Sequence, residues 1–165
     1  MFKIKSNNLK SKRMETSKIK KVLIAIDYDK TAEIVAEAGY AMAKAMNAEI
    51  TLLHILYERP NYYIESPAVY EYQIGYIENL KVSLQNFLNE TKKHLGDVSI
   101  DTMIKEGEIA ETILYTAKEI GADIIVIGAH SRNWFDNIIM GNDAKAILKR
   151  TTIPLFIVPI VTDKK

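Results

Sequence analysis

The chain has 165 residues, of which 48% are hydrophobic, and a formal net charge of +1 at pH 7. This length and hydrophobic content suit one domain with a full-sized core, and no apolar run is long enough to cross a bilayer. The absence of cysteine excludes disulfides, thiolate metal sites and a cysteine nucleophile, and it fits the cytoplasmic location that we expect.

The small net charge hides an uneven distribution. Residues 1–21 hold eight Lys or Arg and one acid, Glu15, which leaves 14 basic and 20 acidic residues for the rest of the chain. We expect residues 1–20 to form a solvated, disordered leader, because blocks of like charge are usually unfolded. Contact of this leader with nucleic acid or an anionic surface is the alternative. We expect the domain to span residues 21–162, and the acidic balance of the rest of the chain argues against nucleic-acid binding by the domain itself.

Five apolar segments of strand length alternate with four segments of helical periodicity. The strands are expected at about 22–26, 49–56, 98–105, 123–127 and 153–159, and the helices at about 31–47, 70–96, 107–121 and just after 141. This alternation predicts an α/β fold, a single doubly wound domain with a parallel sheet and four helices on both faces. The alternating strand 98–105 and the proline-bracketed strand 153–159 are expected near the sheet edges.

The first helix carries an apolar stripe that we expect to face the sheet. It consists of Ile34, Val35, Ala38, Ala41, Met42 and Ala45. Six of the nine tyrosines lie between residues 57 and 76. We expect Tyr72 and Tyr76 to pack the long helix against the sheet. The tyrosines of the preceding loop could instead cover a pocket or meet a partner.

One stretch combines a buried strand with two glycines. The apolar run 122–127 ends at Gly128, a polar loop follows, and Gly141 precedes the last helical segment. In a parallel sheet this geometry brings backbone N–H groups and a helix N-terminus to the carboxyl edge of a strand. The stretch therefore predicts a site for a small anionic ligand.

Several segments together resemble the universal stress proteins. They are Ile24-Ala25-Ile26-Asp27, Leu52-Leu53-His54-Ile55, Gly107 with its helix, the run 121–130, and Ile153-Pro154-Leu155-Phe156-Ile157-Val158-Pro159. Each segment is weak alone, but their order and spacing are specific, and they cover about residues 21–159. The resemblance implies a five-stranded parallel sheet of order 3-2-1-4-5. It also implies a homodimer formed through the last strand, here Leu155, Phe156, Ile157 and Val158.

Some universal stress proteins bind ATP through a glycine motif that this chain keeps in altered form. The motif is Gly, two residues, Gly, nine residues, Gly, and then Ser or Thr. This chain has the same spacing, with Ser131 at the second glycine position and Asn142 at the hydroxyl position. Asp143 stands where an apolar residue is more usual. The resemblance implies ATP or another adenine nucleotide as ligand, with Mg²⁺ if it is a triphosphate, or no ligand at all.

The nucleotide-binding residues that the resemblance implies come from three strands and the start of the last helix. They are Asp27, Tyr28, Leu53, Ile127, Gly128, His130, Ser131, Arg132, Gly141, Asn142 and Asp143. Asp27 has an equally good interpretation as a loop residue that caps a helix. His54 is expected to be a hydrogen-bonded core or rim histidine and His94 a surface residue, so the histidines make no case for a metal site.

The three departures from the motif differ in their expected effect. Ser131 would cost about 1 kcal/mol if its φ is positive, and Asn142 is a good helix N-cap. Asp143 in the first helical turn would satisfy the helix dipole with the protein's own carboxylate and would repel a triphosphate. We therefore expect a retained pocket with a compromised phosphate clamp.

Three functions follow from these observations. The first is a cytoplasmic, dimeric stress-response regulator or protective protein that binds an adenine nucleotide and is not a robust enzyme, with at most weak ATP hydrolysis. The second is a family member that binds no nucleotide and acts through a protein partner alone. The third, an enzyme on a related nucleotide-binding fold, lacks support because the turn 27–30 has no glycine-rich pyrophosphate loop.

Overall fold

The computed structural model describes residues 18–57, 67–131 and 141–161. Nine elements alternate along these residues: β1 Lys21–Ala25, α1 Ala32–Ala45, β2 Glu49–Leu56, α2 Pro67–His94, β3 Asp101–Glu106, α3 Ile109–Glu119, β4 Ile124–Ser131, α4 Asn142–Arg150 and β5 Leu155–Val161. The strands form one parallel sheet of order β3-β2-β1-β4-β5. The predicted fold class and strand order are confirmed, and the two strands expected near the edges, β3 and β5, are the edge strands.

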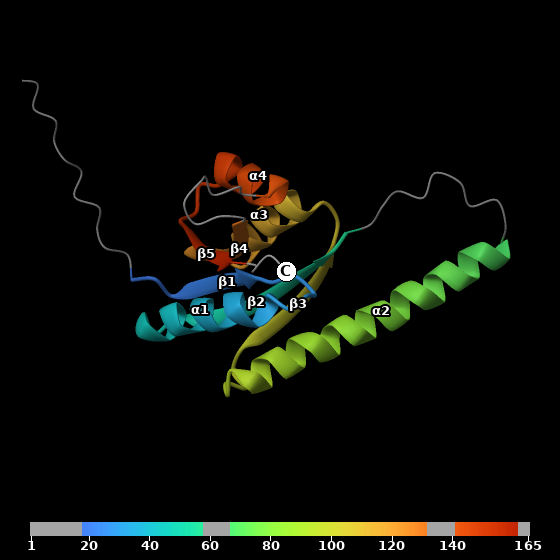
Figure 1. Ribbon diagram of the computed structural model, residues 1–165, viewed down its shortest axis with the longest axis horizontal. Helices are drawn as coiled ribbons and strands as arrows, with labels where there is room; N and C mark the ends of the chain where they lie inside the picture. The colour runs from blue at the N-terminus through green and yellow to red at the C-terminus, as the bar shows by residue number, and fades with distance from the viewer. Residues whose placement is uncertain (1–17, 58–66, 132–140, 162–165) are drawn as a thin grey trace, which may run out of the picture.

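Two helices cover each face of the sheet (Figure 1). Side chains from α1, α2 and one face of each strand form the first core cluster, and α3 and α4 pack on the other face to form the second. In β1, Val22 and Ile24 belong to the first cluster and Leu23 to the second, and all three are fully buried. A strand covered on both faces reads as an unbroken apolar run, which is why β1 was recognisable.

The buried stripe of α1 differs from the predicted one. The helix buries Ala32, Val35, Ala36, Gly39 and Ala43, whereas Ile34 is 49% exposed. A methyl group added at Gly39 would lie 2.8 Å from Ile24 Cδ1, so α1 lies too close to the sheet for a large side chain there. Because α1 lies so close to the sheet, the face of the helix that carries its smallest residues is the one that is buried.

The ends of several elements are shifted from their predicted positions: α2 begins at Pro67 rather than at Tyr70, and β4 ends at Ser131 rather than at Ile127. β3 begins at Asp101 rather than at Val98, which is 83% exposed. A turn replaces the expected start of the strand, because the Asp97 carboxylate accepts a hydrogen bond from the Ser99 N–H at 3.0 Å. β5 begins and ends two residues later than predicted, at Leu155 and Val161.

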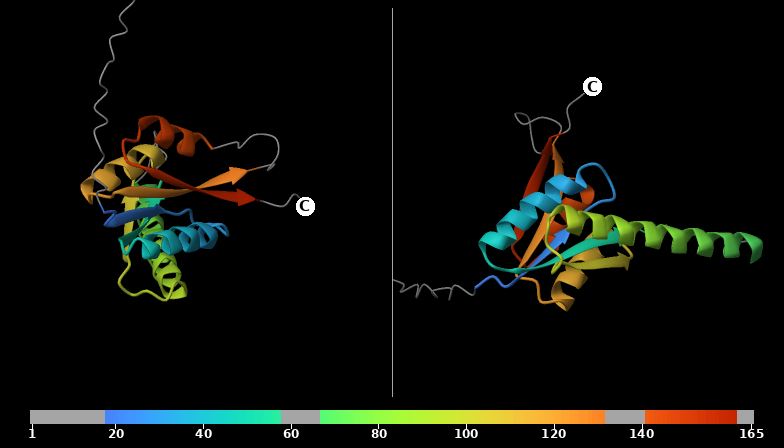
Figure 2. Two further views of the ribbon diagram at one scale, coloured as in Figure 1. Left: turned by 90° about the vertical axis from the view of Figure 1, so that its left-hand side faces the viewer. Right: turned by 90° about the horizontal axis from the view of Figure 1, so that it is seen from below.

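The N-terminal half of α2 extends past the sheet (Figures 1 and 2). Among the α2 residues whose side chains the structure describes, the buried ones are Leu84, Leu88 and Thr91, in the second half of the helix. In the first half, Ile74 is 40% and Tyr76 is 61% exposed. The expectation that Tyr76 packs against the sheet is therefore wrong, because the sheet does not reach that part of the helix. The side chain of Tyr72 lies outside the described residues.

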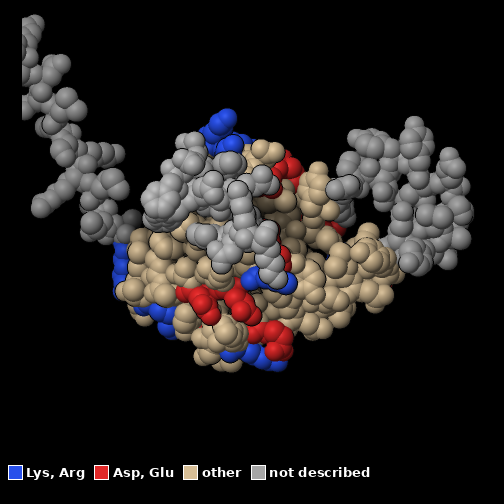
Figure 3. Space-filling view, viewed as in Figure 1, with Lys and Arg blue, Asp and Glu red and all other residues tan. Residues whose placement is uncertain are grey.

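Part of the surface of the described residues is acidic. Asp and Glu side chains gather over the region of α1 on the face seen in Figure 3. No helix among the described residues is both long enough and apolar enough to cross a membrane. Residues 1–17 of the predicted leader, which comprises residues 1–20, lie outside the described residues.

Candidate functional site

The chain leaves the carboxyl ends of β1 and β4 in opposite directions. β1 and β4 are paired neighbours, but β1 is followed by α1 and then β2 on one side, and β4 by α4 and then β5 on the other. The connections therefore diverge between the two strands. In open α/β sheets this topological switch point is where ligands bind.

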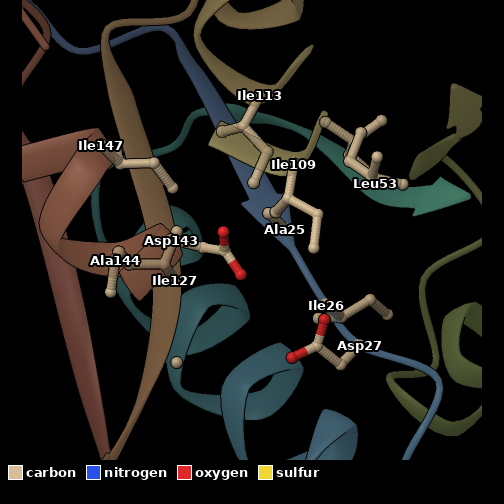
Figure 4. Close-up of a pocket in the computed structure, with 12 residues that line it drawn as sticks. Ala25, Ile26, Asp27, Leu53, Ile109, Ile113, Ile127, Asp143, Ala144 and Ile147 are labelled. Atoms are coloured by element: carbon tan, nitrogen blue, oxygen red, sulfur yellow. The ribbon is translucent and has the colours of Figure 1, made fainter. Parts of the chain in front are cut away.

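A cleft opens at this switch point, on the face covered by α3 and α4 (Figure 4). Its cavity volume is about 80 Å³, below the roughly 300–1,000 Å³ of typical small-molecule sites, and its mouth is open to solvent. Its lining residues come from β1, β2, α3, β4 and α4: Ala25, Ile26, Asp27, Leu53, Ile55, Ile109, Ile113, Ile127, Gly128, Asp143, Ala144 and Ile147. Asp27 and Gly128, the pair expected to flank a crevice, both line it.

The cleft has an apolar interior and two carboxylates. Ile113 and Ile147 belong to the second core cluster and are almost fully buried. Asp27 follows β1, Asp143 lies in the first turn of α4, and both side chains reach into the cleft in Figure 4. Both residues are exposed, so solvent reaches the carboxylates. The arrangement offers an apolar surface for a flat or aliphatic group and two acceptors for hydroxyl or amino groups.

The two glycines of the motif have different local environments. Gly141 is the N-cap residue of α4 with φ −55°, and no side chain caps the helix. A methyl group added there would meet no atom of the described residues within 4 Å. A methyl group on Gly128 would lie 2.7 Å from Ile160 Cδ1 and 2.8 Å from Val35 Cγ2. The packing of α1 and β5 therefore requires a glycine at Gly128.

The expected strain at Ser131 does not arise. β4 continues through Ser131, which pairs with Val161, so its backbone is extended rather than left-handed. Asn142 is the first residue of α4 and not its N-cap, because Gly141 occupies that position. Asp143 lies in the first helical turn, as predicted.

The remaining predicted site residues are only partly brought together. Leu53 and Ile127 line the cleft. Tyr28 does not line it, since its ring stacks edge-on against Phe87 of α2 with centroids 4.9 Å apart. His130 belongs to β4, but its side chain, like that of Ser131, lies outside the described residues, and so does all of Arg132.

Some cleft residues were not identified from the sequence. Ile109 and Ile113 of α3 line the cleft, as do Ala25, Ile55 and Ile147. The available signal was that α3 turns an apolar face toward the sheet directly above the end of β2. The spacing of the glycines gives no information on this wall.

The histidines have hydrogen-bond partners of their own. The Nδ1 atom of His54 lies 2.9 Å from the Ile26 carbonyl oxygen, as expected of a satisfied rim histidine. His94 is a surface residue whose Nε2 lies 2.8 Å from a Glu37 carboxylate oxygen, a bond that raises the pKa of His94. Among the described residues, no group of three or more His, Asp or Glu is placed to hold a metal ion.

The fold and the cleft define a doubly wound α/β domain with a cleft at its switch point. The model of the universal stress protein family matches residues 18–159. The chain belongs to this family.

Known relatives agree with this assignment. Universal stress protein MJ0577 of Methanocaldococcus jannaschii is 28% identical over 156 residues, which covers 84% of this chain and 94% of the relative. Its solved structure superposes with a TM-score of 0.70 over 88% of this chain and 99% of that one. A universal stress protein of Archaeoglobus fulgidus, solved in complex with dAMP, has a TM-score of 0.58 at 18% identity and covers 85% and 98% of the two chains. A universal stress protein solved in complex with cAMP has a TM-score of 0.61 at 17% identity, covering 87% and 98%.

Proposed function

We propose that this universal stress protein binds an adenine nucleotide in the switch-point cleft and acts in the cytoplasm as a stress-response regulator or protective protein. The observation that carries the proposal is the cleft itself, which places Asp27, Gly128 and the start of α4 around one apolar hollow. The structures of two fold relatives in complex with dAMP and cAMP support the choice of an adenine ligand.

The lining residues suit the parts of such a ligand. The apolar wall of Leu53, Ile109 and Ile113 suits an adenine ring. The exposed Asp27 carboxylate can accept hydrogen bonds from ribose hydroxyls or the adenine amino group. The first N–H groups of α4, beyond Gly141, have no intrahelical partner and suit a phosphate. If the ligand is a triphosphate, Mg²⁺ would accompany it.

A thermal melt tests this proposal. Adenosine, AMP, cAMP and ATP with Mg²⁺ are each added at millimolar concentration, with guanosine as control. A ligand at a hundred times its dissociation constant should stabilise the fold by about 2.7 kcal/mol. If none of the four adenine ligands raises the Tm, the nucleotide function is rejected.

We also propose that the protein is a binding protein rather than an enzyme, with at most weak ATP hydrolysis. Among the described lining residues, the ionisable groups are the two aspartates, and no nucleophile is paired with a base. Phosphate release above background that Asp27→Ala abolishes would instead indicate a hydrolase.

We further propose a homodimer formed through β5. This strand is a sheet edge, and Phe156 on it is 37% exposed, whereas Val158 is buried in its own core. Leu155 and Ile157 are partly buried against the second core cluster. Sedimentation should show a dimer at tens of micromolar protein that Phe156→Lys weakens. A monomer at that concentration would count against pairing through β5.

The second candidate function is a protein-interaction module without nucleotide. The exposed Ile74, Tyr76 and Val82 on α2 favour it, because such side chains are enriched where proteins meet. The same melt separates the two functions, since a module of this kind gains no stability from any adenine ligand.

A further inference from the structure

The cleft has an unusual charge composition for a site that would hold phosphates. Its described lining residues include two acids, Asp27 and Asp143, and no Lys, Arg or His. The other lining residues are apolar or glycine. Because field lines concentrate in a cleft with low-dielectric walls, the Asp143 carboxylate makes the potential negative at the α4 side of the cleft. Such a cleft favours ligands with little negative charge.

Asp143 is placed where it acts most directly on a phosphate. The first N–H groups of α4 and the helix dipole attract an anion to the helix start. Asp143 lies within this first turn, and its carboxylate reaches into the cleft (Figure 4). The protein therefore supplies its own anion beside the position that a phosphate chain would take.

No basic residue of α4 offsets this carboxylate inside the cleft. Lys145 is exposed and is not among the cleft-lining residues. Six ion pairs of the described residues are formed by Lys21, Lys44, Lys81, Lys93, His94 and Lys105. Asp143 is not the acidic partner in any of these pairs. The charge of Asp143 is thus presented to the ligand, and Asn142 before it contributes only a neutral amide.

We propose that the cleft selects an adenine ligand of low negative charge, a nucleoside or a nucleoside monophosphate, over a polyphosphate, and that Asp143 sets this selectivity. The inference rests on the proposed adenine site and specifies which class of ligand that site accepts. Repulsion grows with each phosphate charge and is absent for adenosine. Affinity therefore falls in the order adenosine or AMP, ADP, ATP.

The test is the variant Asp143→Asn, which removes the charge and keeps the size of the side chain. Calorimetric titrations with adenosine, AMP and ATP are run in EDTA at low salt, since Mg²⁺ and salt both weaken the repulsion. Asp101→Asn is the matched control, because it makes the same charge change at the amino end of β3, at the opposite end of the strands. A melt of each variant verifies that it is folded.

We expect Asp143→Asn to raise the affinity for ATP at least tenfold, which is about 1.4 kcal/mol. Its affinity for adenosine should stay within twofold of the wild type, and the control should change neither. In roughly 0.5 M salt, the increase in ATP affinity of Asp143→Asn over the wild type should shrink toward zero, because the Debye length falls to a few ångströms.

Two results overturn the proposal, and they are distinguishable from failure of the adenine site. If wild-type protein binds ATP as tightly as adenosine in EDTA, or if Asp143→Asn leaves the ratio of the two affinities unchanged, the selectivity is refuted while the adenine site stands. If neither protein binds adenosine, AMP or ATP at millimolar concentration, the adenine site itself is refuted, and this inference with it.

Discussion

Replacing Gly128 by alanine tests why a glycine is present at the edge of the cleft. The glycine can serve the close packing of α1 and β5, or it can let a ligand approach the backbone. The backbone at Gly128 is not left-handed, so the substitution strains no dihedral angle. The new methyl group would lie 2.8 Å from Val35 Cγ2 and 2.7 Å from Ile160 Cδ1. The Ile160 methyl ends a flexible side chain and can turn away. Val35 is β-branched and sits in a helix, where one rotamer strongly dominates.

The expected cost follows from these contacts. Overpacking of a core costs about 1–3 kcal/mol, and the loss of glycine freedom in the unfolded chain returns about 0.4–1 kcal/mol. We expect a net destabilisation of about 1.5 kcal/mol, which lowers the Tm by about 3–6 °C in a protein of this size. Urea denaturation and thermal melts followed by circular dichroism measure both quantities.

A second substitution tests whether Val35 is the obstacle. Val35→Ala alone should cost about 2 kcal/mol, because two methyl groups are lost and a cavity remains. In the double variant the new methyl of Gly128→Ala occupies part of that cavity. The double variant should therefore be at least about 1 kcal/mol more stable than the sum of the single effects predicts. Additivity within about 0.5 kcal/mol would refute the packing explanation.

A control and a binding measurement complete this experiment. Gly75→Ala in α2 adds a methyl group that meets no atom of the described residues within 4 Å, so it should stabilise the protein by up to about 1 kcal/mol. The methyl on Gly128 would point toward α1, on the face opposite the cleft. Adenosine affinity should therefore stay within twofold in Gly128→Ala. A large loss of affinity in a folded variant would instead show that ligand approach requires the glycine.

Three further predictions concern stability and pH. Thr116→Val should raise the free energy of unfolding by about 1 kcal/mol in urea denaturation, because the fully buried Thr116 hydroxyl has no hydrogen-bond partner among the described residues. A loss of stability would show that the hydroxyl is satisfied. Asp123→Ala should lower the free energy of unfolding by about 2 kcal/mol, because the Asp123 carboxylate accepts hydrogen bonds from two N–H groups at the start of β1, at 2.8 and 3.0 Å. An unchanged melt would contradict this prediction. The Ser99 hydroxyl and then Lys44 lower the pKa of Asp97 from 3.8 to about 2, so the folded protein holds this carboxylate ionised more strongly than the unfolded chain does. Its contribution to stability is present above pH 4 and is lost as the pH falls toward 2, so Asp97→Asn should flatten the decline of Tm in that window, and an identical decline would refute the linkage.

The strands, the helices and the identity of the edge strands were predictable because their signals are local, whereas the sheet order followed from the resemblance to the universal stress proteins. Burial on both faces makes β1 an unbroken apolar run, and prolines mark β5 as an edge. The cleft was also foreseen in outline, since the ends of β1 and β4 must diverge in this topology. The polar residues on it that the sequence indicated, Asp27 and Asp143, both line the observed cleft.

Other features required the tertiary structure. Both faces of α1 carry apolar residues, and only the distance between helix and sheet decided that Val35 faces inward and Ile34 outward. Tyr28 adjoins Asp27 in the chain, yet its ring packs on Phe87, because α2 offers a ring on that side. The sequence by itself determined which segments are strands and helices and which residues follow each strand, since periodicity and burial are written into neighbouring residues. The tertiary structure alone decided which side chains share a space, because that depends on how closely elements distant in the chain approach one another.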